Sequence, residues 1–159
     1  MITIRPAIPK DVSLLLQFIR ELAEYEREAH AVVATEADLL RDGFGLQGSK
    51  FRALLAEWNG KPAGYALFFG VYSTWDGRPG IFLEDLFVRE ALRGKGIGKA
   101  LLAQVARIAQ AEGCFGIRWE VLDWNEAAIQ FYKSLGADFL DHWRTVLLRR
   151  EAMAQLARG

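Results

Sequence analysis

Cysteine is nearly absent from this sequence, and neither sign of charge exceeds the other. The single cysteine, Cys114, cannot form an internal disulfide, and the two histidines are isolated, so no cluster suggests a metal site. Lys and Arg together number 20, as do Asp and Glu, which leaves a formal net charge of zero. This balance lacks the basic excess that binding to a phosphate backbone needs. We therefore expect no metal, no nucleic-acid partner and a reducing, cytoplasmic location.

Long apolar runs are also missing. No stretch approaches the roughly 20 residues that cross a bilayer, and residues 1–10 lack the basic start and continuous apolar run of a signal peptide. We expect no membrane partner. The 159 residues, of which 52% are hydrophobic and 25% charged, suit one folded domain over residues 1–159.

Periodicity and turn residues predict a mixed α/β chain. Alternating or β-branched runs predict strands at residues 2–4, 51–58, 63–72, 81–88, 116–122 and 143–148. Helical spacing predicts helices at residues 11–22, 35–43, 101–113 and 125–136, with a further helical turn or two after Arg149. Asn59-Gly60 and Asp76-Gly77 predict turns between antiparallel strands, whereas the helix between residues 88 and 116 predicts a parallel pair. This order excludes a doubly wound parallel sheet.

A glycine-rich loop connects a predicted strand to a predicted helix. Its sequence is Arg93-Gly94-Lys95-Gly96-Ile97-Gly98-Lys99. Backbone N–H groups at such a helix start bind anions, and glycines let the backbone approach a pyrophosphate. A P-loop would need glycine at Arg93 and serine or threonine at Ala100, and the dinucleotide fingerprint would need glycine at Lys99. The loop therefore predicts a phosphate site of another kind.

The loop resembles the acetyl-coenzyme A signature of the GNAT superfamily of N-acetyltransferases, matched by Arg93-Gly94-Lys95-Gly96-Ile97-Gly98. The segments around it are similar to those of the family, namely Leu83-Glu84-Asp85-Leu86-Phe87-Val88, Asp123-Trp124-Asn125, Phe131-Tyr132-Lys133 and Leu135-Gly136-Ala137. Glu21-Leu22-Ala23-Glu24-Tyr25-Glu26 resembles the spermidine/spermine and thialysine acetyltransferase branch. The resemblance implies the GNAT fold, an α/β fold whose mixed, mostly antiparallel sheet is flanked by helices. It also implies direct transfer of acetyl from acetyl-CoA to a primary amine of a small cationic molecule, such as a polyamine, thialysine or similar diamine.

The resemblance further implies how acetyl-CoA, the co-substrate, is held. Its pyrophosphate would lie on the N–H groups of the loop, and its pantetheine arm would run beside residues 86–88 like an added strand. An N–H group near Val88 would polarise the thioester carbonyl. Asn125 would hold the pantetheine, although it equally suits the N-cap of a helix. The predicted cofactor-binding residues are Leu86, Phe87, Val88, Arg93, Gly94, Lys95, Gly96, Ile97, Gly98, Lys99, Asn125 and Lys133.

Acyl transfer to an amine needs two proton movements, and the resemblance suggests a residue for each. Tyr132 aligns with the tyrosine that protonates the coenzyme A sulfur, although its spacing also suits a core aromatic. An alkyl ammonium with a pKa near ~10.4 costs on the order of 4–5 kcal/mol to present as free amine at pH 7. Glu84 is the predicted base, acting through water; the competing interpretation is a strand carboxylate paired with an arginine. Because neighbours on a strand face opposite ways, we expect at most one of Glu84 and Asp85 to face the acetyl group.

Charge pairing and cation–π contact with an elongated cation suggest the substrate-binding candidates. They are Tyr25, Glu26, Trp75, Asp76, Glu84, Asp85, Asp123 and Trp124. The acidic residues of the first helix would otherwise form a solvated face. The branch resemblance also implies a homodimer with substrate sites near the interface. Two alternatives remain open: a protein lysine or N-terminal acetyltransferase, and a coenzyme A-binding module without turnover.

Overall fold

The computed structural model describes all residues from Met1 to Gly159. The chain forms two compact units, Met1–Leu122 and Asp123–Gly159, and each is described by itself. The first unit holds one sheet and the helices that cover it. Its elements in chain order are β1 (Ile2–Pro6), α1 (Val12–Tyr25), α2 (Glu36–Phe44), β2 (Arg52–Trp58), β3 (Lys61–Ser73), β4 (Arg78–Val88), α3 (Ile97–Ala111) and β5 (Ile117–Trp119). Short 3-10 helices cover Pro9–Asp11, Ala29–Ala31 and Glu90–Leu92.

The five strands form one sheet in the order β1-β2-β3-β4-β5. The first four are antiparallel neighbours, and β4 pairs with β5 in parallel. The parallel pair follows from α3, which carries the chain from the end of β4 back to the start of β5. The predicted mixed, mostly antiparallel sheet is confirmed.

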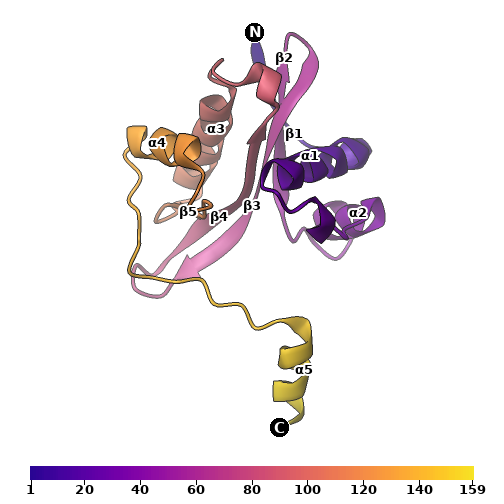
Figure 1. Cartoon of the computed structure of the whole chain (residues 1–159), viewed down its shortest axis with the longest axis vertical. Coiled ribbons are helices and arrows are strands. Elements are labelled where there is room, and N and C mark those ends of the chain that lie inside the picture. The colour runs from indigo at the N-terminus through magenta and orange to yellow at the C-terminus, as the bar shows by residue number, and fades with distance from the viewer. The chain divides into compact units, whose positions relative to one another are not determined.

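Helices cover both faces of this sheet (Figure 1). On one face, Leu15 and Phe18 of α1 pack with Leu39 of α2 against β2, β3 and β4. On the other face, Leu101 and Val105 of α3 pack against side chains of the same sheet. These residues recur with helical spacing, which is why their pattern predicts both helices. None of the helices combines the length and apolar character that a bilayer crossing needs.

Capping residues set the ends of two helices at the predicted places. The N–H of Asp38 donates to Thr35 Oγ1 at 3.2 Å, and the N–H of Thr35 donates to Asp38 Oδ2 at 2.9 Å. This reciprocal pair starts α2. Gly113, with a φ of 70°, takes the left-handed conformation that ends α3.

One extra residue in β4 changes which way its side chains point. Phe68 of β3 pairs with Leu83, but Leu67 pairs with Asp85, so Glu84 is skipped in the register. A bulge of this kind re-aims the side chains that follow it. Asp85 consequently lies on the α1 face of the sheet with Leu67, whereas unbroken pairing would turn it to the α3 face. The regular alternation expected for residues 84 and 85 does not hold.

The second unit carries two helices, α4 (Glu126–Ser134) and α5 (Arg150–Arg158). The side-chain oxygen of Asn125 accepts a hydrogen bond from the Ala128 N–H at 3.3 Å, so Asn125 caps α4. Gly136, with a φ of 81°, follows the helix. The predicted helix and both of its end signals are confirmed.

The prediction of a strand at residues 143–148 is wrong. Residues 143–149 hold no helix or strand, and Trp143, Val146 and Leu147 are 62%, 91% and 68% exposed. Strand propensity does not by itself provide a neighbouring strand for the backbone hydrogen bonds. The strand expected at residues 116–122 is likewise shorter, because only β5 pairs with the sheet. The helical tail expected after Arg149 is confirmed as α5.

Candidate active site

The glycine-rich loop leads directly into α3. Gly94 and Gly96 have φ values of 77° and 81°, a conformation that favours glycine, and a Cβ added at either would meet nothing within 4 Å. Gly96 immediately precedes α3, so the N–H groups of the first helical turn have no acceptor within the helix. These donors and the helix dipole favour an anion at this end of α3. The open space beside the glycines leaves the backbone accessible to a phosphate-bearing ligand.

Next to this loop, β4 and β5 separate. They pair only along Ile81 to Leu83 of β4, although β4 continues to Val88. The edge of β4 beyond Leu83 therefore offers its backbone groups without a strand neighbour on that side. The side chains of Leu86 and Phe87 pack into the cores on opposite faces, so the backbone is what this edge presents. An extended ligand fits such an edge by adding hydrogen bonds like a strand.

Three carboxyl groups gather on the α1 face of β4, and we call them the carboxyl cluster. Glu84 and Asp85 come from the bulge, and Glu26 is the C-cap of α1. The charge of Glu26 acts on Asp85 and that of Glu84 acts on Glu26. No ion pair of the structure includes any of the three. The interpretation of Glu84 as a strand carboxylate paired with an arginine is therefore not supported.

Burial raises the pKa of every member of the carboxyl cluster, and the charge of a neighbouring carboxylate adds to each rise. Desolvation raises the pKa of Asp85 from 3.8 to about 6; Glu84 and Glu26 add to the rise, while a hydrogen bond from Tyr65 opposes it. Desolvation also raises the pKa of Glu84, with help from Glu120. The pKa of Glu26 rises through desolvation and the charge of Glu84. A bound cation would favour the ionised form of all three groups, so the cluster suits an ammonium ligand.

Arg93 connects the glycine-rich loop to the end of α1. Its guanidinium lies 4.3 Å from the centre of the Tyr25 ring, and its Nε donates to the Val88 carbonyl at 3.0 Å. The Tyr25 ring packs against the core on the α1 face of the sheet, the face that carries the carboxyl cluster. The ammonium of Lys95 lies 5.5 Å from the Trp58 ring centre. Arg93 and Lys95, two of the four predicted cationic ligands of the co-substrate, are thus directed over aromatic rings.

Trp75 and Asp76 lie in the turn between β3 and β4, away from the carboxyl cluster. Trp75 is 87% exposed, and Asp76 accepts a hydrogen bond from the Ser73 hydroxyl at 2.6 Å. Ser73 is six residues beyond Leu67, which pairs with Asp85. At about 3.3 Å per residue this is roughly 20 Å along the strand. Within one chain, the structure does not bring these two substrate candidates to the cluster.

The remaining predicted site residues belong to the second unit. Tyr132 is 8% exposed, and its ring centre lies 5.5 Å from that of Phe131. The ammonium of Lys133 lies 5.7 Å from the Phe139 ring centre. Asp123 and Trp124 are exposed and precede α4. The expected second role of Asn125 as a helix cap is confirmed, while its role toward pantetheine stays a prediction.

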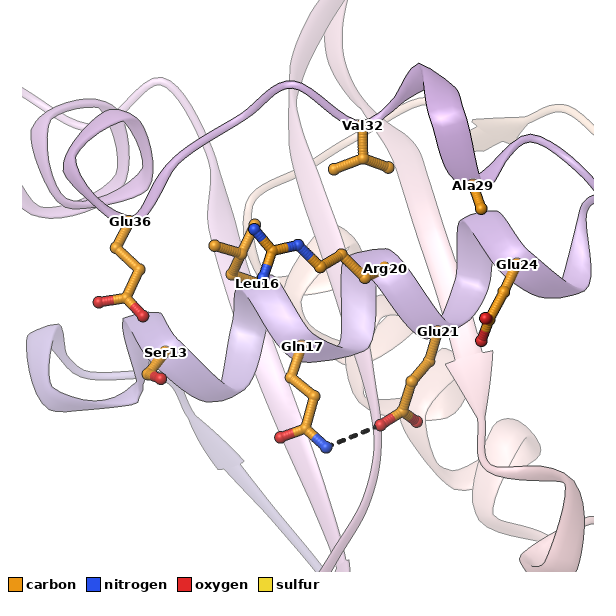
Figure 2. A pocket seen from close by; sticks show the side chains of 9 residues that line it. All are labelled: Ser13, Leu16, Gln17, Arg20, Glu21, Glu24, Ala29, Val32 and Glu36. Carbon is orange, nitrogen blue, oxygen red and sulfur yellow. Dashed lines mark hydrogen bonds between the residues drawn. The ribbon is translucent and has the colours of Figure 1, made fainter.

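A pocket of about 550 Å³ lies elsewhere, along the outer side of α1 (Figure 2). Figure 2 shows Arg20 between Glu36 and Glu24, with Gln17 donating to Glu21 at 2.9 Å. Glu21 is also paired with Arg89. None of the predicted site residues lines this pocket. The charged residues of its lining are Arg20, Glu21, Glu24 and Glu36.

Two residues at the site escape the sequence analysis. Tyr65 of β3 donates its hydroxyl proton to Asp85 Oδ2 at 2.8 Å, but in sequence it looks like one more core aromatic. Glu120, just beyond β5, acts on Glu84 through its charge. The signal for Tyr65 was its hydroxyl within an otherwise apolar run of β3. No local signal marks Glu120, because its proximity depends on the pairing of β4 with β5.

A mixed sheet that opens beside an anion-binding loop, with a carboxyl cluster on its α1 face, is the arrangement expected of an acyltransferase with an extended, phosphate-bearing donor. The acetyltransferase (GNAT) family profile matches residues 15–137. The chain belongs to this family, whose members use acetyl-CoA as co-substrate, and it is an N-acetyltransferase. The predicted fold and enzyme class are confirmed.

Relatives matched over nearly their full length agree with this assignment, and a solved structure agrees with the fold. A thialysine N-epsilon-acetyltransferase from Sus scrofa is 41% identical over 98% of this chain and 97% of its own length. An L-ornithine N5-acetyltransferase from Arabidopsis thaliana is 31% identical over 94% of this chain and 85% of its own length. The structure of a V. cholerae integron cassette protein is 25% identical with a TM-score of 0.80, covering 99% of this chain and 98% of that one.

Proposed function

We propose that this enzyme acetylates a primary amine of a small cationic molecule, such as a polyamine, thialysine or a similar diamine. The observation that carries the proposal is the carboxyl cluster, whose members have raised pKa values and no basic partner. A protonated amine supplies the missing positive charge. Similar proteins named for thialysine, L-ornithine and spermidine/spermine support the same substrate class. A cytoplasmic location, where acetyl-CoA is available, belongs to the proposal.

The donor is proposed to bind through backbone groups. The N–H groups from Gly94 to Lys99 would hold the pyrophosphate, and the open edge of β4 would hold the pantetheine arm. The N–H of Val88 is the proposed donor to the thioester carbonyl, where negative charge develops as the amine attacks. Asn125 and Lys133 are proposed to add side-chain contacts. Acetyl-CoA supplies the activated acyl group, and these residues orient it.

The acceptor is proposed to bind as an ammonium and to react as an amine. Asp85 and Glu26 would attract the cation, and Tyr25 would border its alkyl chain. Glu84 would accept the ammonium proton through water, which frees the nitrogen lone pair for attack on the carbonyl carbon. Tyr132 would donate a proton to the departing thiolate. Trp75, Asp76, Asp123 and Trp124 are proposed to contact the far end of a longer amine.

Thiol release from acetyl-CoA tests the proposal. The panel holds spermidine, spermine, thialysine, lysine, L-ornithine, short diamines and a lysine-containing peptide, each measured against enzyme without amine. We expect turnover on at least one class of free diamine and none on the peptide. Turnover on the peptide alone would instead make the enzyme a protein acetyltransferase. Binding of acetyl-CoA without thiol release from any acceptor would make it a non-catalytic module.

The loop assignment predicts a defect confined to donor binding. Gly96→Val places a branched side chain where the pyrophosphate is proposed to lie, and we expect acetyl-CoA affinity to fall by roughly tenfold or more, measured by calorimetry. The φ of 81° at Gly96 also strains valine. Gly113→Val, at a φ of 70° beyond α3, is the matched control for that strain. Equal acetyl-CoA affinity in both variants would contradict the loop assignment.

We also propose that the enzyme is a homodimer with its substrate sites near the interface. The support is the apolar surface of the C-terminal segment, in which Trp143, Val146, Leu147 and Leu148 are between 51% and 91% exposed. Burying one such side chain gains about 1.5–3 kcal/mol. We propose that a second copy of the chain buries this apolar surface.

Charge in that segment should break the dimer. The double variant Val146→Asp with Leu148→Asp is expected to sediment as a monomer of 17.9 kDa, whereas the parent chain sediments at twice that mass. Leu46→Asp, at an exposed position before β2, is the control and should stay dimeric. A parent chain that is monomeric at all concentrations would overturn the dimer proposal without affecting the proposed chemistry.

A further inference from the structure

Tyr65 is the one polar side chain in a buried stretch of β3. Ala63 to Phe68 are all buried, and Tyr65 is fully buried. A tyrosine hydroxyl in such a place needs a hydrogen-bond partner. Its partner is Oδ2 of Asp85, at 2.8 Å. The buried Tyr65 hydroxyl is thus satisfied by a single hydrogen bond, and its acceptor belongs to the carboxyl cluster.

Three features fix the direction of that bond. The ring of Tyr65 stacks on Phe18 of α1, with centres 5.5 Å apart and planes 4° from parallel. Gly64 lets β3 and β4 approach closely, since a Cβ there would lie 2.2 Å from the Phe87 carbonyl oxygen. The bulge turns Asp85 onto the Tyr65 side of the sheet. The Tyr65 hydroxyl is therefore fixed in position, and its hydrogen bond fixes the position of the Asp85 carboxylate.

Resting on the proposed function, we infer that Tyr65 is a positioning residue for the acceptor amine. Its hydroxyl holds Oδ2 of Asp85 and leaves Oδ1 for the ammonium of the substrate. The charged and titratable groups that face Asp85 are Tyr65 from β3, Glu84 from β4 and Glu26 from the end of α1. Both carboxylates repel the charge of Asp85, and only Tyr65 stabilises it. Tyr65 thereby keeps Asp85 available as an anion.

The direction of the pH effect follows from this arrangement. The pKa of Asp85 is about 6 with the Tyr65 bond in place, and the bond opposes the rise caused by burial. Without the hydroxyl, the pKa of Asp85 moves higher still. A smaller fraction of Asp85 is then ionised near neutral pH, and the protonated form cannot pair with an ammonium. Above the new pKa both forms of the enzyme again carry an ionised Asp85.

Tyr65→Phe tests the inference, because phenylalanine keeps the stack on Phe18. For a cationic amine we expect KM near pH 6.5 to rise by roughly threefold, with the acid limb of kcat/KM displaced upward by about one pH unit. The deficit should shrink toward pH 9. The affinity for acetyl-CoA should stay unchanged. A ring that only fills the core would move none of these pH-dependent quantities.

Two comparisons make the result decisive. Tyr72→Phe removes an exposed hydroxyl from the same strand and should match the parent enzyme at every pH. In an Asp85→Asn background, Tyr65→Phe should add almost no further loss of kcat/KM, because the two residues act as a unit. Equal losses in both backgrounds would overturn the inference, as would a Tyr65→Phe profile identical to that of the parent. A parent enzyme silent on every amine would overturn the proposed function, and this inference with it.

Discussion

Tyr132→Phe is expected to lower kcat by about 10²-fold or more, because the departing thiolate loses its proton donor. The affinity for acetyl-CoA should change little, since the ring itself remains. Single-turnover kinetics give the rate of the chemical step, and calorimetry gives the affinity. The combination separates a proton donor from a binding residue.

Phe131→Leu is the control for packing next to Tyr132, because the two rings are neighbours at 5.5 Å. It alters the aromatic surroundings of Tyr132 and keeps the hydroxyl. If both variants lose the same small factor in kcat, or if Tyr132→Phe turns over like the parent, Tyr132 is a core aromatic. The proton donor would then have to be another group.

Glu84→Gln is expected to lower kcat by about 10²-fold near neutral pH, the usual loss for a general base. The pKa of Glu84 is raised above its ordinary value, so in the parent enzyme the rate should fall as pH drops through that raised pKa. The glutamine variant lacks the Glu84 carboxylate, so its rate should show no such fall. Its deficit should shrink as pH approaches ~10, where the amine loses its proton to solvent without help. A pH-rate profile of both enzymes measures the effect.

Glu120→Gln is the matched control for Glu84→Gln. It removes a neighbouring carboxylate that raises the pKa of Glu84 by charge repulsion. Because the pKa of Glu84 should fall in this variant, the acid limb of the rate should move to lower pH while the plateau stays at the parent value. A variant Glu84→Gln with the parent plateau would remove Glu84 from the proton pathway.

Features that depend on a few consecutive residues could be predicted from the sequence. The glycine-rich loop, the Thr35–Asp38 capping pair and the Asn125 cap all depend on side chains within one turn of the backbone they contact. The mixed sheet followed from the order of strands and the long connection through α3. Such signals survive without knowledge of the rest of the fold.

Features that depend on pairing across the sheet could not be predicted from the sequence. The bulge at Glu84 arises where Leu67 and Phe68 meet β4, and nothing in residues 83–85 alone announces it. Strict alternation separates Glu84 from Asp85 and hides the bond from Tyr65. The failed strand at residues 143–148 has the same origin, because an apolar, β-prone run gives no information about the strand it would join.

The burial of Asp85 places this residue's most favourable contribution to stability and its working state at different pH values. A carboxyl group whose pKa is 3.8 when unfolded and about 6 when folded binds protons more tightly in the folded chain. Its contribution to folding is therefore fully present below pH 3.8, and about 3 kcal/mol of it is lost as pH rises from there through 6. Amine capture needs the opposite protonation state. The enzyme thus carries out its reaction where this residue weakens the fold, and the rest of the core must supply the difference.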